Sequence, residues 1–124
     1  MGIYKTKPFA RFADRENVED SALCDAVHRA EEGLVDADLG GGVIKQRIAR
    51  PGQGKSGGFR SILLFRQGER AFFAYGFAKS DRGNIRKDEL KAFRLLAAEM
   101  LAMDDKALRA AAANGTIIEV ICDG

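Results

Sequence analysis

Residues 59 to 77 read FRSILLFRQGERAFFAYGF, and this stretch decides the fold. Both FRSILLFR (59–66) and RAFFAYGF (70–77) are rich in residues that favour strands, and neither has a helical period. Gln67 and Gly68 lie between them, and so short a connection predicts an antiparallel β-hairpin. The aromatic residues of the hairpin are more than enough to fill one face of a core. Most of them are therefore expected in the core rather than on a platform for stacking bases: Phe59, Phe65, Phe72, Phe73, Tyr75 and Phe77.

A third strand is expected immediately upstream, in VIKQRIAR (43–50). Ile44 and Ile48 alternate there with Lys45 and Arg47, so one face packs inward while the other presents two cations. The three strands together predict an antiparallel meander. The glycine-rich stretch DADLGGG (36–42) before them is expected to be a loop.

Helical patterns flank the meander on both sides. Phe9 and Phe12 share one face of the first pattern, and Gly33 is expected to stop the second. The order α, α, β, β, β, α, α, β places the chain in the α+β class, with two N-terminal helices, a small antiparallel sheet and C-terminal helices. The expected helices cover residues 7–14, 20–32 and 86–103, then a short segment that Asp104 caps, and the last strand covers residues 116–121.

The chain has 124 residues, 46% of them hydrophobic and 31% charged, which is typical of one soluble globular domain. There are no repeats, low-complexity tracts or linkers, so a single domain is expected over residues 1–124. No apolar run approaches the roughly 18 residues of a membrane span, and MGIYKTKPFARFADR at the start has no apolar signal core. A cytoplasmic protein without a membrane partner is therefore expected.

Cys24 falls in a helical pattern and Cys122 lies close to the end, and neither has metal-ligand spacing. The two could pair in principle, but both are expected to be reduced. His28 follows Cys24 by four residues and shares its helix face, yet no third or fourth metal ligand is evident. We therefore interpret His28 as a boundary residue and expect no metal.

The segment ARPGQGKS (49–56) matches the looser form of a phosphate-binding P-loop, with Ala49 in place of the first glycine. A P-loop directs its phosphate at the N-terminus of a following helix. Here Gly57 and Gly58 lead into a strand pattern, and no apolar run ends in an aspartate that could hold magnesium. The sequence therefore predicts a mobile hairpin loop and no nucleotide cofactor.

Charge is strongly segregated along the chain. The formal net charge is +2, but residues 43–94 contain 13 basic and four acidic residues, so this segment carries +9 and the remainder −7. Such a segment is typical of a surface that meets a polyanion such as nucleic acid, and the alternative is an ordinary solvated face.

No nucleophilic triad, acidic metal cluster or dinucleotide fingerprint is present in the sequence. The basic residues around the sheet are therefore the candidate site residues. Because each hairpin brings the end of one strand beside the start of the next, six cations are expected on one surface: Lys45, Arg47, Lys55, Arg60, Lys79 and Arg82.

Two motifs, GKSGGFRSILLFR (54–66) and RAFFAYGFAKSDRGNI (70–85), resemble the RelE-like toxins of bacterial toxin–antitoxin pairs, especially a subgroup close to the HigB toxins. The resemblance runs from about residue 36 to residue 90. It implies a compact fold related to small microbial RNases, and an endoribonuclease that cuts messenger RNA in the ribosomal decoding site. It also implies a cognate antitoxin that covers the basic sheet.

The resemblance assigns the basic strand positions of the family to Lys45 and Arg47, and its strand arginine to Arg60. The basic residue after the third strand corresponds to Lys79 or Arg82. Many relatives have a tyrosine where this chain has Ile85, and the histidines of HigB members have no counterpart here.

Cations suit RNA cleavage because attack of a 2′-hydroxyl on the adjacent phosphate builds negative charge that preorganised donors stabilise. Arg60 is the expected phosphate clamp, and Lys45 or Lys55 is the candidate base because a dense positive cluster favours the neutral amine. Two alternatives remain on the same scaffold: a ParE-like protein that inhibits gyrase without catalysis, and a non-catalytic RNA-binding domain.

Overall fold

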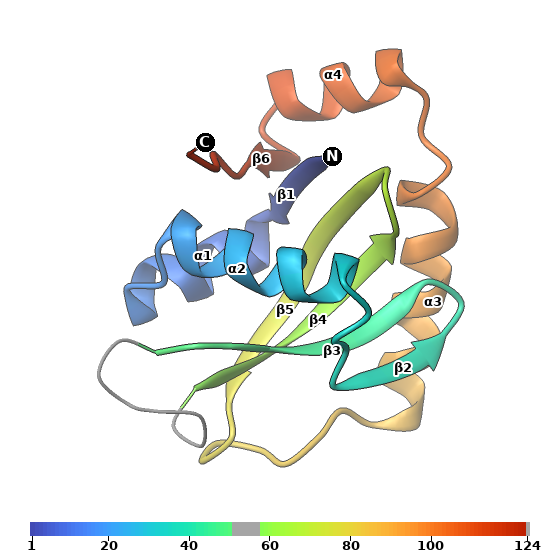
Figure 1. The fold of residues 1–124 in the computed structure, drawn as a ribbon. Coiled ribbons are helices and arrows are strands. Elements are labelled where there is room, and N and C mark those ends of the chain that lie inside the picture. Colours follow the sequence, from blue (N-terminus) through green and yellow to red (C-terminus); the bar gives the residue numbers. More distant parts are fainter. Residues whose placement is uncertain (51–57, 124) are drawn as a thin grey trace.

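The computed structural model describes residues 1–50 and 58–123, and in this part of the chain one sheet lies between two helical layers (Figure 1). None of the described helices is long and apolar enough to cross a membrane. The elements follow in the order β1 (Gly2–Thr6), α1 (Lys7–Glu16), α2 (Asp20–Glu31), β2 (Ala37–Gly40), β3 (Val43–Ile48), β4 (Phe59–Arg66), β5 (Arg70–Ala78), α3 (Lys87–Met100), α4 (Asp105–Ala113) and β6 (Ile117–Glu119).

The sheet of the described residues has six strands in the order β2-β3-β4-β5-β1-β6. Neighbouring strands from β2 to β5 are antiparallel, β1 runs parallel to β5, and β6 is antiparallel to β1. The meander and its hairpin are confirmed, since Phe59 pairs with both Ile48 and Ala78. The α+β class is confirmed as well, but the sheet is mixed and larger than expected.

The prediction that the chain starts with two helices is wrong, because β1 precedes them. GIYKT (2–6) is too short to show a period, and its strand conformation depends on partners far along the chain. Ile3 pairs with Ala71 of β5, and Lys5 pairs with Ile118 of β6. Thr6 then ends the strand and caps α1, as its Oγ1 accepts a hydrogen bond from the Phe9 N–H (3.4 Å).

The prediction of a loop at residues 36–42 is also wrong in part, because β2 occupies Ala37–Gly40. Asp and Gly are depleted in strands, so the local pattern hides β2. Pairing with β3 overrides that preference, and Ala37 lies opposite Lys45. The glycines then make the turn into β3, with positive φ angles of 82°, 65° and 83° at Gly40, Gly41 and Gly42.

Each face of the sheet has its own apolar core. On one face α1 and α2 contribute Phe9, Phe12 and Leu23, which join Leu63 and Phe73 of the sheet. On the other face α3 covers the sheet, and the buried members there include Ile62, Leu64, Phe72, Ala97, Met100 and Leu101. Because both faces of β4 and β5 are covered, their side chains are buried almost without alternation.

Two buried polar side chains join β3 to its neighbours. The Gln46 amide donates to the carbonyls of Ala26 and Leu34, both at 2.9 Å, and its oxygen accepts from the Asp36 N–H (3.2 Å). The Ser61 hydroxyl donates to the Gln46 carbonyl (2.8 Å). These bonds hold β3 against α2 and thereby set the direction of the side chains on its other face.

The expectation of reduced cysteines is wrong, because Cys24 and Cys122 form a disulfide with their Cα atoms 5.9 Å apart. The residues are 98 positions apart in sequence, and the tertiary structure brings them together. The segment after β6 runs beside β1 and α2, where the Val120 N–H donates to the Ile3 carbonyl (2.8 Å) and the Ile121 N–H donates to Asp20 (3.0 Å).

Candidate functional site

Two cross-strand rows of side chains lie on the face of the sheet that α3 covers. Since side chains alternate along a strand, residues two positions from Ile62 share its face. The register aligns Lys45, Ile62 and Tyr75 across β3, β4 and β5, and we call these the tyrosine row. The adjacent row, which we call the arginine row, aligns Arg47, Arg60 and Phe77.

A β-bulge on β5 directs Tyr75 into this face. The pairing shifts by one residue between Ile62 and Leu63, which oppose Tyr75 and Phe73, so Ala74 is the extra residue on β5. Ala74 and Tyr75 consequently both contact the core under α3. Bulges commonly redirect a side chain next to a functional site, and this one gives Tyr75 a position that strict alternation would not.

Arg60 lies in the middle of the arginine row, two residues after a tight bend. A Cβ on Gly58 would lie 2.5 Å from the Ile48 carbonyl oxygen, so only glycine fits there. The Arg60 Nη1 atom is buried and has no hydrogen-bond partner within residues 1–50 and 58–123. Because buried donors in native proteins are nearly always paired, this nitrogen is suited to an anionic ligand.

Arg47 is held in the arginine row through its backbone. Its N–H donates to the Asp36 carboxylate (2.5 Å), and its carbonyl accepts from the Arg29 guanidinium (2.6 Å). Arg47 and Arg60 are directly opposite each other in the strand register, so the row brings two arginines of neighbouring strands together. Because guanidinium groups bind phosphate oxygens well, this pair suits a phosphate ligand.

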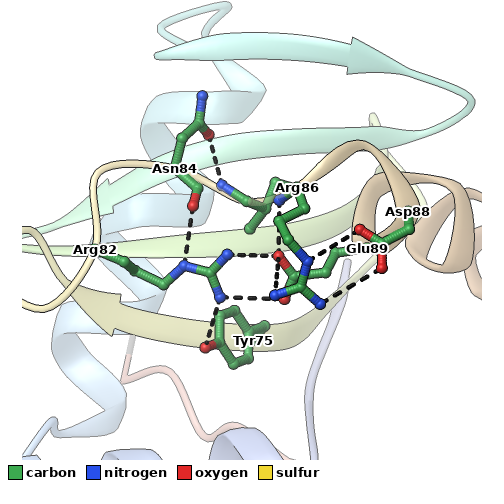
Figure 2. A network of polar contacts seen from close by, with 7 residues as sticks. Tyr75, Arg82, Asn84, Arg86, Asp88 and Glu89 are labelled. Carbon is green, nitrogen blue, oxygen red and sulfur yellow. Dashed lines mark hydrogen bonds and ion pairs between the residues drawn. The ribbon is translucent and has the colours of Figure 1, made fainter.

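Arg82 lies in the segment between β5 and α3 and makes four hydrogen bonds there (Figure 2). Its guanidinium donates to both Glu89 carboxylate oxygens, at 2.5 and 3.1 Å, and to the Tyr75 hydroxyl at 3.2 Å, while Nε donates to the Asn84 carbonyl at 2.9 Å. The guanidinium carbon lies 5.7 Å from the ring centroids of both Tyr75 and Phe77. Arg82 is therefore tied to both rows.

The same contacts keep Arg82 and Glu89 ionised. The pKa of Glu89 is lowered from 4.5 to about 2. The hydrogen bond from the Arg82 side chain is the largest cause, and the hydrogen bond from the Arg86 backbone N–H is the second largest. In return the hydrogen bond to Glu89 raises the pKa of Arg82. Glu89 also caps α3, since its carboxylate accepts from the Arg86 N–H (2.7 Å). The ion pair thus anchors the segment after β5 to the start of α3.

The six predicted site residues have different positions. Lys45, Arg47 and Arg60 lie on one face of neighbouring strands, and Arg82 is linked to that face through Tyr75 and Phe77. Lys79 follows β5 directly and is exposed. Lys55 lies outside the described residues.

Several other cations of the basic segment bind backbone carbonyls instead of facing this site. The Arg66 and Arg70 guanidiniums donate to the carbonyls of Leu101 (2.9 Å) and Met103 (2.6 Å), at the C-terminal end of α3. The Arg94 guanidinium donates to the Leu39 carbonyl beside β2. Fewer basic residues therefore face the site than the segment charge of +9 suggests.

Sequence reasoning missed two residues of this site, Tyr75 and Glu89. The sequence pattern does not separate Tyr75 from the core aromatics, of which Phe59, Phe72 and Phe73 are indeed buried. A polar hydroxyl in an otherwise apolar strand is the only signal that sets Tyr75 apart. Glu89 has the spacing of a capping residue, three positions after Arg86, and nothing in the sequence relates it to Arg82.

The P-loop resemblance finds no support in the described part of the chain. The pattern at residues 49–56 is followed by β4, which starts at Phe59, so the expected strand is confirmed and no helix N-terminus follows the glycines. No group of three or more His, Cys, Asp or Glu side chains that could hold a metal lies together among the described residues.

A family model described as the RelE toxin of the RelE/RelB toxin–antitoxin system matches residues 1–120. The match spans both rows, the Arg82 network and all strands of the sheet described above. No curated protein matches the chain.

Proposed function

The chain belongs to the RelE toxin family of toxin–antitoxin systems, and from that premise we propose that it is a ribosome-dependent endoribonuclease that cleaves messenger RNA without a metal ion. As a family member it has a cognate antitoxin as its partner. The observation that carries the proposal is the arginine row, where the buried Nη1 of Arg60 has no hydrogen-bond partner among described residues and Arg47 lies directly opposite.

The reaction needs fixed positive charge more than it needs an acid and base pair. When the 2′-hydroxyl of RNA attacks the adjacent phosphate, negative charge grows on the nonbridging oxygens. Preorganised donors in a poorly hydrated site stabilise that charge, and removing one such donor typically costs 10² to 10³ in rate. Arg60 suits this role, because its planar fork matches two phosphate oxygens and its strand is buried between two cores.

Lys45 is the candidate base within the described residues. It lies in the tyrosine row, beside the arginine row on the same strand, and is half-buried. Lys55, as the alternative base, and Lys79, as a further phosphate contact, belong to the same proposal. Since the substrate is ribosome-bound messenger RNA, the proposed place of action is the cytoplasm.

The test uses purified protein and ribosomes programmed with end-labelled messenger RNA. We expect cleavage in the decoding site that leaves a 2′,3′-cyclic phosphate, and we expect Arg60→Ala to abolish most of it. A parallel assay measures supercoiling by DNA gyrase. Intact message together with inhibited gyrase would overturn the proposal in favour of the ParE-like alternative, and RNA binding without cleavage would favour a non-catalytic domain.

A further inference from the structure

The Tyr75 hydroxyl has a hydrogen to donate and no acceptor for it within the described ranges. Its oxygen accepts from Arg82 Nη1 (3.2 Å), and the direction of this bond is certain because a guanidinium can only donate. The hydroxyl hydrogen must therefore point away from Arg82. No carbonyl, carboxylate or other acceptor of residues 1–50 and 58–123 receives it.

Tyr75 lies within reach of a phosphate held by the arginine row. Arg60 is the diagonal neighbour of Tyr75, since Arg60 opposes Phe77 and Tyr75 opposes Ile62. Diagonal neighbours on one face of a sheet lie about 7–8 Å apart, a gap that an arginine, a phosphate and a tyrosine can span. Lys45, at the other end of the tyrosine row, is two strand spacings or about 9 to 10 Å away from Tyr75. A phosphate on Arg60 would thus have Tyr75 on one side and Lys45 on the other.

The hydroxyl is also held rigidly. The Tyr75 ring packs near those of Phe77 and Phe93, with centroid distances of 5.8 and 6.1 Å, and the Arg82 guanidinium carbon lies 5.7 Å from its centroid. Arg82 itself cannot clamp the phosphate, because its fork already binds both oxygens of Glu89 (Figure 2). Its other two hydrogen bonds go to the Asn84 carbonyl and to the Tyr75 hydroxyl oxygen.

We propose that Tyr75 is the general acid that protonates the leaving 5′-oxygen, and that Arg82 and Glu89 are positioning residues that hold and polarise its hydroxyl. This inference rests on the proposed function. The bond between O2′ and phosphorus forms while the bond between phosphorus and O5′ breaks. The 2′-hydroxyl proton passes to the base, the Tyr75 proton passes to O5′, and the products are a 2′,3′-cyclic phosphate and a 5′-hydroxyl. The tyrosinate, stabilised by the Arg82 hydrogen bond, regains a proton from water.

The test replaces the leaving oxygen at the mapped cleavage site by sulfur, because a thiolate leaves without being protonated. In single turnovers on programmed ribosomes we expect Tyr75→Phe to slow cleavage of the ordinary message by about 10² to 10⁴, the usual contribution of a general acid. On the 5′-phosphorothiolate message the variant should come within about tenfold of the wild type, since only protonation of the leaving group is lost.

The chain offers a matched control, because Tyr4 is its only other tyrosine. Tyr4 is buried and stacks on Phe72 in the core under α3, so Tyr4→Phe should cleave both messages at the wild-type rate. Glu89→Gln should cleave the ordinary message more slowly than the wild type and should regain the wild-type rate on the 5′-phosphorothiolate message. This is expected because Glu89 acts through Tyr75.

The outcomes separate this inference from the proposed function. If Tyr75→Phe is slowed equally on both messages, or is not slowed on the ordinary one, Tyr75 is not the acid, although the protein remains a nuclease. If the wild type cleaves neither message, the proposed function fails and this inference fails with it.

Discussion

Arg60 and Arg82 have the same guanidinium group but opposite surroundings. Arg82 donates to a carboxylate, a hydroxyl and a carbonyl, whereas Nη1 of Arg60 is buried without a partner among the residues described. An unpaired buried donor lowers the free energy of unfolding by about 1 to 3 kcal/mol, so Arg60 destabilises the fold. That cost is understandable if the donor is paired only when the phosphate is bound.

Arg60→Ala should lower single-turnover cleavage by 10² to 10³, because one preorganised contact to the transition state is lost. Arg60→Lys should recover only part of the rate, since a point charge cannot bind two oxygens in a plane. The melting temperature should stay at the wild-type value or rise. Arg109→Ala, on the exposed face of α4, is the control and should cleave normally. Cleavage by Arg60→Ala at more than about a third of the wild-type rate would make Arg60 a folding residue.

Glu89 should give the protein an acid-dependent stability. Its pKa is about 2 when folded and near 4.5 when unfolded, so the ionised carboxylate stabilises the fold above about pH 4.5. This contribution is lost as the pH falls from 4.5 towards 2. Urea unfolding should therefore show wild type more stable than Glu89→Gln at neutral pH, with the difference shrinking across that window. A difference that does not change with pH would contradict the ion pair.

Among the elements, α1 packs closely on β5 because the strand has a glycine, Gly76, at the point of contact. Phe12 of α1 packs over Gly76 of β5, and a Cβ at position 76 would lie 2.5 Å from the Phe12 ring. Phe12 also meets Phe59 edge to face, with centroids 5.3 Å apart. The glycine in the strand, which weakens β-propensity, is thus explained by the close approach of a helix.

Gly76→Ala should destabilise the protein by about 1 to 3 kcal/mol, because the buried Phe12 ring must move within a packed core. Gly83→Ala is the matched control, since no heavy atom lies within 4 Å of a Cβ built there. Urea unfolding of both variants measures the difference. Equal stability of the two would show that α1 adjusts its position over β5 at no cost.

At the scale of the whole molecule, the disulfide links α2, near the start of the chain, to the segment after β6. Cys24 and Cys122 are 98 positions apart in a chain of 124 residues, and the bond fastens the segment after β6 to α2. Val120 in that segment is buried in the core under α1 and α2. A crosslink of this span chiefly restricts the unfolded chain, since it forbids the extended states that the free ends would reach.

Reduction of the disulfide should lower the free energy of unfolding by about 2 to 5 kcal/mol, as expected for a closed loop of about 100 residues. The double variant with Cys24→Ser and Cys122→Ser should show the same loss and should not respond to reductant. Urea unfolding with and without a thiol-free reductant measures both. No change on reduction of the wild type would mean that β6 and its contacts hold the segment without the bond.

The sequence by itself determined the elements whose signal is local. The three meander strands, the four helices and the cap at Asp104 follow from residue patterns within a few turns or strand lengths, and all are present. The alternation in β3 likewise placed Lys45 and Arg47 on one face, because period two is a property of the strand itself. The motifs around Arg60 and Lys79 indicated the family that the match over residues 1–120 bears out.

Only the tertiary structure decided what depends on distant partners. β1 and β2 exist because β5, β6 and β3 pair with them, and the two cysteines meet because β6 returns to β1. The Arg82 network needs β5, its bulge and α3 to meet, so neither Tyr75 nor Glu89 could be assigned from its neighbours in sequence. The physical reason is the same in each case: short segments and single side chains have weak preferences of their own, and the free energy that orders them comes from long-range pairing and packing.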